Sequence, residues 1–249
     1  MFAATSNLSR ARAGHSATLL PNGEVLLVGG DSGGPVYTAE LFEPGTGTFK
    51  TTGGTTAQRR GVATLLGNGK VLLPGGSNTA SADLFDPATG TFTATGALAA
   101  TREFHTATLL PNGTVLIVGG TGPGLAVIAE LYDPWTETFT VTGALTRGRV
   151  AHTATLLPNG KVLIVGGAGG SDSAIATAEL YDPATGVFAL TGTMATRRAF
   201  HTATLLPNGR VLVAGGIDNG AIPLATAELY DQATGTFTAT GALATARQR

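Results

Sequence analysis

The nine residues HTATLLPNG occur at His201–Gly209, at His152–Gly160 and at His105–Gly113. A fourth copy, HSATLLPNG, differs at one residue and lies at His15–Gly23. A chain that repeats such a segment is built from copies of one structural unit, and an internal repeat is the first feature that a fold prediction must explain. The spacing of the copies therefore sets the size of the unit.

A pair of glycines recurs at a similar spacing along the whole chain. The pairs begin at residues 29, 75, 119, 166 and 215, at intervals of 46, 44, 47 and 49 residues. An Ala-acid-Leu-aromatic segment follows each pair, and a phenylalanine lies seven residues after its aromatic residue. The chain thus contains five related units, with approximate boundaries 13–60, 61–104, 105–151, 152–200 and 201–249, preceded by residues 1–12.

Each unit has the pattern of four short β-strands. HTATLL and KVLIVG are β-rich runs joined by Pro-Asn-Gly, and Asn-Gly between apolar runs is a strong hairpin signal. TAELYD is the third strand, DPATG is the turn after it, and TFTATG is the fourth strand. No segment has helical periodicity over a useful length. Repeated four-stranded units predict an all-β fold, a β-propeller of five blades, in a single domain over residues 1–249.

The repeat also resembles a known family. The glycine pair that closes the second strand, the two spaced aromatic residues and the Arg-x-x-His lead-in are similar to kelch repeats, including those of the galactose oxidase propeller. The resemblance implies a propeller that acts as a binding module. The chain departs from the family in having phenylalanine where tryptophan is usual, and five units where six or seven blades are usual. It has no cysteine, so the tyrosine–cysteine crosslink of galactose oxidase does not carry over.

The two ends of the chain match one another. Phe2–Thr5 and Arg12 align with Phe237–Thr240 and Arg247, so the sequence holds six candidates for five outer-strand positions. The favoured interpretation is a closed five-bladed ring with a spare strand, and a piece of a longer array is the alternative. We expect a monomer, with a strand-exchanged oligomer as the alternative.

Composition excludes several classes of partner. The formal net charge is −1 and charged residues make up 12% of the chain, so no basic field favours nucleic acid or an anionic membrane. The longest apolar runs are too short to cross a bilayer, and no signal peptide is recognisable. The compartment stays open, and an extracellular location would require a signal that has been removed. No cofactor is predicted.

Loops vary between the units at one end of the blades. The PNG and DPATG turns share one end and barely change, which indicates turn chemistry. The loops after the glycine pairs and the crossovers to the next blade share the other end, and these loops differ strongly between the units. Because loops on a rigid scaffold commonly carry binding, we predict the ligand face there. Sequence drift in loops that have no binding role predicts the same variation between the units.

Arginines gather at the same end. One arginine three residues before the histidine position and one acid at the start of the third strand predict a repeated salt bridge that ties neighbouring blades. These residues are Arg12, Arg102, Arg149, Arg198 and Arg247, with Glu40, Asp83, Glu130, Glu179 and Glu228. Additional arginines are better candidates for binding a carboxylate, phosphate or sulfated sugar, because the guanidinium fork matches such anions. These are Arg10, Arg59, Arg60, Arg147 and Arg197.

Four repeated histidines allow two interpretations. His15, His105, His152 and His201 each lead into the first strand of a unit. Their imidazoles could approach one another in a central channel, where they would suit zinc, copper or nickel. Alternatively, each ring lies in a blade interface and bonds to a backbone carbonyl. We favour the structural role, because a duplicated scaffold position keeps its residue whether or not a metal site exists.

The sequence therefore favours a non-catalytic binding module and not an enzyme. The expected partner is a protein segment or a glycan, with anionic groups favoured. One alternative is a purely structural or engineered repeat propeller without a ligand. A metal site on the histidines is the other alternative.

Overall fold

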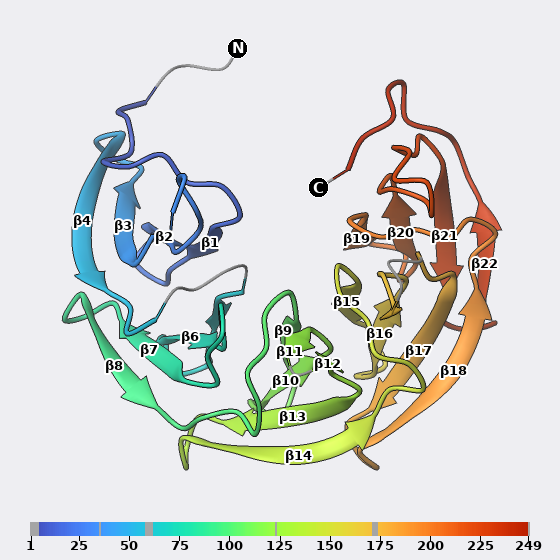
Figure 1. Cartoon of the computed structure of the whole chain (residues 1–249), viewed down its shortest axis with the longest axis horizontal. Helices are drawn as coiled ribbons and strands as arrows, with labels where there is room; N and C mark the ends of the chain where they lie inside the picture. Colours follow the sequence, from blue (N-terminus) through green and yellow to red (C-terminus); the bar gives the residue numbers. More distant parts are fainter. Residues whose placement is uncertain (1–4, 35, 58–61, 123, 171–173, 249) are drawn as a thin grey trace. The chain divides into compact units, whose positions relative to one another are not determined.

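The computed structural model describes residues 5–34, 36–57, 62–122, 124–170 and 174–248 (Figure 1). Over these residues the chain has no α-helix and forms five four-stranded antiparallel sheets, one for each repeat unit. The all-β fold with five propeller-type blades predicted from the repeats is confirmed. In the described ranges there is accordingly no helix that could span a membrane.

The strands of each sheet follow one another in sequence. The first sheet comprises β1 (Ser16–Leu19), β2 (Val25–Val28), β3 (Thr38–Glu43) and β4 (Thr48–Gly54). The second comprises β5 (Thr64–Leu65), β6 (Val71–Pro74), β7 (Ala82–Asp86) and β8 (Thr91–Thr95). The third comprises β9 (Thr106–Leu109), β10 (Val115–Val118), β13 (Ile128–Asp133) and β14 (Thr138–Ala144), with a small hairpin of β11 (Thr121–Gly122) and β12 (Gly124–Leu125). The fourth comprises β15 (Thr153–Leu156), β16 (Val162–Val165), β17 (Thr177–Asp182) and β18 (Val187–Thr193). The fifth comprises β19 (Thr202–Leu205), β20 (Val211–Ala214), β21 (Ala227–Asp231) and β22 (Thr236–Ala239).

Two compact units make up the chain. Unit 1 is Met1–Phe104 with Tyr132–Phe139, and unit 2 is His105–Leu131 with Thr140–Arg249. Unit 1 holds the first and second sheets, and unit 2 holds the fourth and fifth. The single domain and the closed ring expected from the sequence stay predictions.

Side chains on the inner strands explain why the second strand of each repeat is a continuous apolar run. All four residues of β16 are buried, and they point alternately to the two sides of the sheet. Leu163 and Val165 pack with Val211 and Val213 of β20, in one cluster that joins the fourth and fifth sheets. We call the side that carries Leu163 the forward face of a sheet, and the side that carries Val211 the back face. The first and second sheets pack in the same way, and so do the third and fourth.

The Pro-Asn-Gly turn is a five-residue connection built around one glycine. The Leu20 amide donates to the Glu24 carbonyl at 2.8 Å, and the Gly23 amide donates to the Leu20 carbonyl at 2.9 Å. Gly23 has φ of 87°, which favours glycine. The Asn22 side-chain oxygen accepts a bond from the Glu24 amide at 3.1 Å. The constancy of this segment is thus a requirement of the turn.

The next blade comes close to the backbone at the glycine pair. The Gly167 amide donates to the carbonyl of Arg198, a residue that leads into the fifth sheet, at 2.9 Å. Gly166 has φ of 58°, and a Cβ there would lie 2.6 Å from that same oxygen and 2.9 Å from Cε1 of His201. Both the backbone conformation and the packing of the neighbouring sheet therefore require glycine at position 166.

The energetic cost of this close approach can be measured by comparing alanine variants at two glycines that both have positive φ. Gly160 has φ of 82° but open space around its Cβ position. We expect Gly160→Ala to cost about 1–2 kcal/mol of unfolding free energy, the cost of the left-handed conformation. Gly166→Ala should cost roughly 3 kcal/mol or more, because the Arg198 carbonyl must also move. The unfolding free energy of both variants is measured by urea unfolding. Equal losses of unfolding free energy would show that the close approach of the Arg198 carbonyl is unimportant.

Candidate functional site

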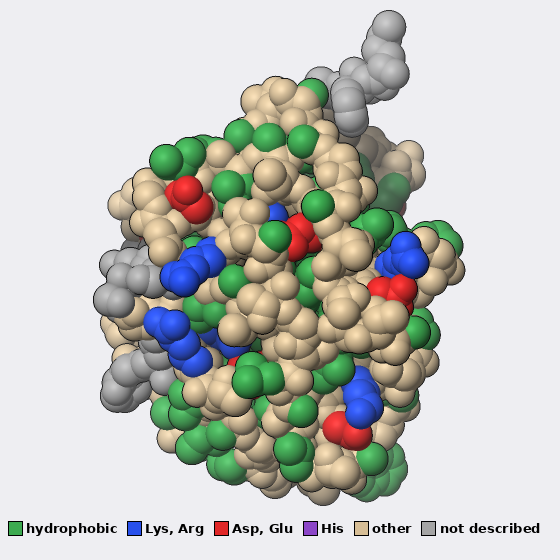
Figure 2. Space-filling model, turned by 90° about the vertical axis from the view of Figure 1, so that its right-hand side faces the viewer, with side chains coloured by type: hydrophobic (Ala, Val, Ile, Leu, Met, Phe, Trp, Pro, Cys, Tyr) green, Lys and Arg blue, Asp and Glu red, His purple; other side chains and the backbone are tan. Residues whose placement is uncertain are grey.

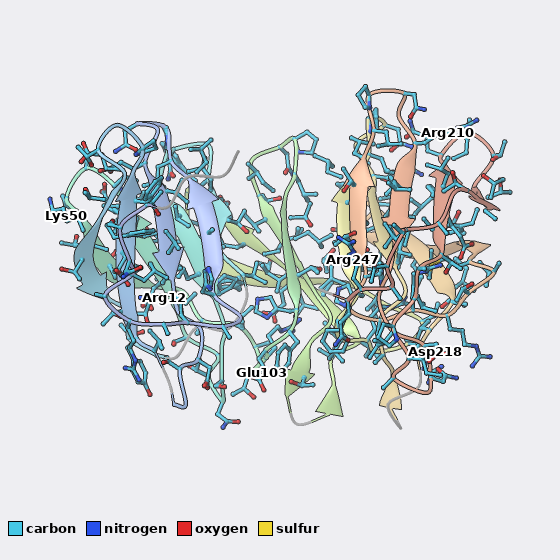
Figure 3. The ribbon with its side chains drawn as sticks, turned by 90° about the horizontal axis from the view of Figure 1, so that it is seen from above. Arg12, Lys50, Glu103, Arg210, Asp218 and Arg247 are labelled. Atoms are coloured by element: carbon cyan, nitrogen blue, oxygen red, sulfur yellow. The ribbon has the colours of Figure 1, made fainter. Side chains whose placement is uncertain are left out.

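The two ends of each sheet carry different chemistry. In the fifth sheet, Arg210 follows the PNG turn and Asp218 lies in the loop between the second and third strands, and Figure 3 shows them at opposite ends. At the turn end, partly exposed ion pairs join Arg210 to Asp231 at 3.1 Å and Lys161 to Asp182 at 3.0 Å. Figure 2 shows lysine or arginine side chains beside acidic ones on one side of the molecule. The loop end is organised differently.

At the loop end, the arginine before each first strand is buried and paired. The side chain of Arg149 is 0% exposed, and its Nη2 lies 2.5 Å from Oε1 of Glu179. Its Nη1 donates to the carbonyls of Gly166 and Thr177 at 3.0 and 3.1 Å. Burial lowers the pKa of Arg149, whereas the Glu179 carboxylate raises it. A guanidinium stays charged in proteins, so this is a buried ion pair with its donors used.

The same arrangement recurs in the first and fifth sheets. Arg198 pairs with Glu228 at 3.0 Å, and Arg12 pairs with Glu40 at 2.6 Å. Although burial raises the pKa of Glu40, hydrogen bonds from Ser9 and Arg12 bring it below its usual value. Other members of the repeated set are buried as well, namely Arg102, Asp83 and Glu130. Arg247, which the sequence also placed in this set, is instead exposed.

The crossover arginine connects consecutive sheets. The Arg149 carbonyl accepts a hydrogen bond from the Gly120 amide of the third sheet at 3.0 Å, while its side chain binds within the fourth sheet. Oε2 of Glu179 accepts a bond from the Thr146 amide in the same crossover at 2.9 Å. The crossover is therefore fixed to the sheet that it leaves and to the sheet that it enters.

Breaking one partner of this pair should be costly. Arg149→Met leaves the Glu179 carboxylate buried without its guanidinium, and we expect a loss of about 3–5 kcal/mol in unfolding free energy. Adding Glu179→Leu should cost less than the sum of the two single changes, because the stranded charge is removed. Lys161→Met, in a partly exposed pair, is the control and should change little. Additive losses in urea unfolding would contradict the coupling.

Histidines fill the interfaces between sheets in unit 2. Nε2 of His152 lies 3.0 Å from Oγ1 of Thr106, and Nε2 of His201 lies 3.0 Å from Oγ1 of Thr153. A Cβ on Gly119 would lie 2.6 Å from Cε1 of His152, so the ring occupies the space over the preceding sheet's glycine pair. These contacts place both rings between sheets, with a threonine hydroxyl as the partner of each Nε2.

The remaining histidines differ in burial. His105 is buried, whereas His15 is half-buried, with Nδ1 3.2 Å from the Arg12 carbonyl.

Burial, together with the charge of Arg149, lowers the pKa of His152 to about 3. His152 is therefore neutral at physiological pH. Within the described ranges, no three His, Cys, Asp or Glu side chains are placed to hold a metal ion.

The low pKa of His152 gives a pH dependence with a defined sign. In the unfolded chain this residue takes up a proton near pH 6.5, whereas the folded chain takes it up only near pH 3. Stability from this residue is therefore complete above pH 6.5 and falls by about 1.4 kcal/mol per pH unit between those values. Urea unfolding at pH 7.0, 5.5 and 4.5 should show a shallower fall for His152→Gln than for the native chain. Parallel pH profiles would exclude this histidine as the source.

The predicted ligand-binding arginines have different surroundings from the paired ones. Arg10, Arg147 and Arg197 are exposed, and among the described residues none of them forms a salt bridge. Arg147 lies against the loop between β16 and β17, where a Cβ on Gly169 would be 2.6 Å from its Nε. Arg59 and Arg60 lie outside the described residues.

An exposed aromatic side chain at the loop end is not among the residues predicted from the sequence. Phe200 is 41% exposed and has φ of 54°, a conformation that bulky residues rarely adopt. Phe104 has the same repeat position, a φ of 57° and an exposure of 44%. Gly14 stands there in the first repeat with φ of 63°. Gly14 is the feature of the sequence that could have indicated this strain. A glycine in one repeat suggests a left-handed backbone conformation at that position, and phenylalanine is strained there.

A series of contacts connects Arg147 to Phe200 through the backbone of unit 2. Arg147 lies against Gly169, the neighbouring Ala168 exchanges hydrogen bonds with Val150, and the Phe200 amide donates to the Ala151 carbonyl at 3.0 Å. Arg197 lies in the crossover three residues before Phe200. We call Arg147, Arg197 and Phe200 the arginine–phenylalanine surface. It lies at the loop end of the fourth and fifth sheets.

The antiparallel four-stranded sheets described above define a protein of the β-propeller class. The family model for the Kelch motif matches residues 149–195, which run from the buried arginine through the fourth strand of the fourth sheet. No curated protein matches the chain. The residue pattern of this repeat recurs in the other sheets, and the match and the five sheets together are consistent with a kelch-repeat β-propeller. Kelch-repeat propellers are generally non-catalytic binding modules, and the blades of this chain fit that role.

Proposed function

We propose that this protein is a non-catalytic interaction module that binds an acidic protein segment at its arginine–phenylalanine surface. One contrast carries the proposal. The repeated arginines Arg149 and Arg198 are fully buried and paired, whereas Arg147 and Arg197 are exposed and have no salt bridge among the described residues. The scaffold uses the first two, and the other two are available to a partner.

The chemistry of the three side chains favours a protein partner with carboxylates. A guanidinium binds a carboxylate through two parallel hydrogen bonds. Arginine and aromatic residues are enriched at the centres of protein interfaces. Keeping Phe200 at φ of 54° costs on the order of 1 kcal/mol, although glycine occupies the same repeat position elsewhere. That cost supports a use for the exposed ring.

At the opposite end, the hollows formed by described residues of unit 1 are shallow and open. One pocket at the turn end of unit 1 has a volume of about 340 Å³ and is open to solvent. Its lining includes Pro21, Asn22, Lys70 and Asp86, which belong to the repeated turns. Small-molecule sites are usually enclosed and mainly apolar, so this pocket is better explained by the shape of the turns.

Binding of model anions tests the proposal. We expect poly-L-glutamate to bind in isothermal titration calorimetry, and the double variant Arg147→Ala/Arg197→Ala to bind at least about tenfold more weakly, a change of about 1.4 kcal/mol. The unfolding midpoint should stay unchanged, because neither side chain has a salt bridge in the described structure. Phe200→Gly, which installs the residue found at position 14, should also weaken binding without lowering the midpoint.

Matched variants keep the result interpretable. Arg210→Ala and Lys161→Ala remove the same charge at the turn end and should leave binding unchanged. Stronger binding of a sulfated oligosaccharide, lost in the same double variant, would replace the protein segment with a glycan. Binding that is equally weakened by the turn-end variants would contradict the proposed surface. No binding of either probe would favour the purely structural alternative.

A further inference from the structure

Six asparagines of the chain are followed directly by glycine. Five of them lie in the repeated turns between the first and second strands, and the sixth, Asn219, lies in the loop between β20 and β21 of the fifth sheet. The turn asparagines are Asn22, Asn68, Asn112, Asn159 and Asn208. Asparagine is a thermolabile residue, and it is most labile before glycine, where no side chain hinders attack of the next amide nitrogen. The chain therefore offers the same labile dipeptide in two structural settings.

In the repeated turns, hydrogen bonds hold both groups that would react. Oδ1 of Asn208 accepts a bond from the Arg210 amide at 3.1 Å, which fixes the asparagine side chain. The Gly209 amide donates to the Leu206 carbonyl at 2.9 Å. The other four turns have the same two bonds, at 3.0–3.1 Å for the asparagine and 2.9–3.0 Å for the glycine. The fold thus restrains the Asn-Gly pair in all five turns.

The sixth pair lacks these restraints. Asn219 is exposed, and in the described part of the chain no hydrogen bond involves its side chain. The Gly220 amide donates at 2.9 Å to Oδ1 of Asp218, which Figure 3 labels at the loop end of the sheet. The same oxygen accepts a bond from the Ile222 amide at 3.0 Å, which closes the turn around Gly220. The Asn219 side chain is therefore free to turn toward the Gly220 nitrogen, whose proton already points at a carboxylate.

We propose that Asn219 is a site of spontaneous deamidation assisted by Asp218, and that the fold protects the five turn asparagines. Asp218 accepts the amide proton of Gly220 as a general base, and the electron pair left on the nitrogen forms a bond to Cγ of Asn219. The side-chain nitrogen of Asn219 leaves with a proton as ammonia, and a five-membered succinimide remains. One water molecule then opens this ring at either carbonyl and yields aspartate or isoaspartate at position 219.

The product adds a charge at the loop end of the fifth sheet. Ile217 and Ala199 exchange two backbone hydrogen bonds, at 2.8 and 3.0 Å, so the loop of Asn219 lies beside the crossover that carries Arg197. Deamidation places a new carboxylate in this loop. Its effect on binding rests on the proposed function: a negative charge here competes with an acidic partner for Arg197. We expect the arginine–phenylalanine surface to weaken as the protein ages.

Peptide mapping of the aged full-length chain tests the modification. Trypsin releases residues 211–247, in which Asn219 is the only asparagine. Asn208 is released separately, in residues 199–210. After incubation of the folded chain at pH 8 and 37 °C, we expect the 211–247 peptide to gain one dalton at least about tenfold faster than the 199–210 peptide. In guanidinium chloride, where the turn bonds are lost, the two asparagines should react at similar rates.

Two outcomes of this mapping contradict the proposal. Equal rates in the folded chain, or an Asn219 that stays unmodified, would overturn it. A rate difference of the same size in guanidinium chloride would attribute the difference to flanking sequence, and the fold would then protect nothing.

Two single substitutions test the chemistry of the loop. Gly220→Ala should slow the reaction, because a Cβ hinders attack by the nitrogen. The fold should tolerate it, since the φ of Gly220 is not positive and the added Cβ meets its nearest atoms at an ordinary 3.4 Å. Asp218→Asn keeps an oxygen that accepts the Gly220 amide but removes the base, and it should slow deamidation at least about tenfold. A native rate in Asp218→Asn would exclude the carboxylate as the base.

The variant Asn219→Asp measures the effect on binding separately from the modification. We expect it to bind poly-L-glutamate roughly two- to fivefold more weakly than the native chain in isothermal titration calorimetry, as suits one exposed charge. Asn208→Asp adds the same charge at the turn end and is the control, with native affinity. Native affinity of Asn219→Asp would refute the effect on the surface. A native chain that does not bind poly-L-glutamate counts against the proposed function, whereas the mass change at Asn219 is measured without any ligand.

Discussion

The buried ion pair at the crossover is the interaction on which the rest of the structure depends. Arg149 places a charged guanidinium between two strands of the fourth sheet, where only a complete set of acceptors makes it tolerable. Its carbonyl, in turn, holds the glycine pair of the preceding sheet. The acid on the third strand and glycines of both adjoining sheets bond to this one residue. The repeat of this chain can be understood as the set of residues that a buried crossover arginine requires.

Much of the fold follows from the sequence because the repeat displays each structural requirement several times. Asn-Gly turns, alternating strands and glycine pairs predict the sheets, and the observed strands lie where these patterns place them. The orientation of the histidines could not be predicted in the same way. His152 precedes a strand with two covered sides, and periodicity does not distinguish a channel from an interface. Only the positions of Thr106 and Gly119 in the preceding sheet fix its direction.

Prediction of the candidate site was limited by a different physical cause. Arg147 and Arg149 are two residues apart and chemically identical, yet one is exposed and the other is fully buried. The difference depends on which of them meets Glu179, a partner thirty residues away. Phe200 escaped prediction because its significance lies in its backbone angle, which no residue type reveals by itself. The comparison with Gly14 supplies that information, since both occupy one position of the repeat.

The correspondence between forward and back faces has a consequence for the gene that encodes this chain. A blade carries on its two sides the matching halves of one interface, so a duplicated blade meets both its neighbours with surfaces that already fit. Unequal recombination between repeats can therefore add or remove whole blades without any compensating point mutation. The number of blades can thus change by one in a single genetic event, whereas the residues that pack between blades must stay the same.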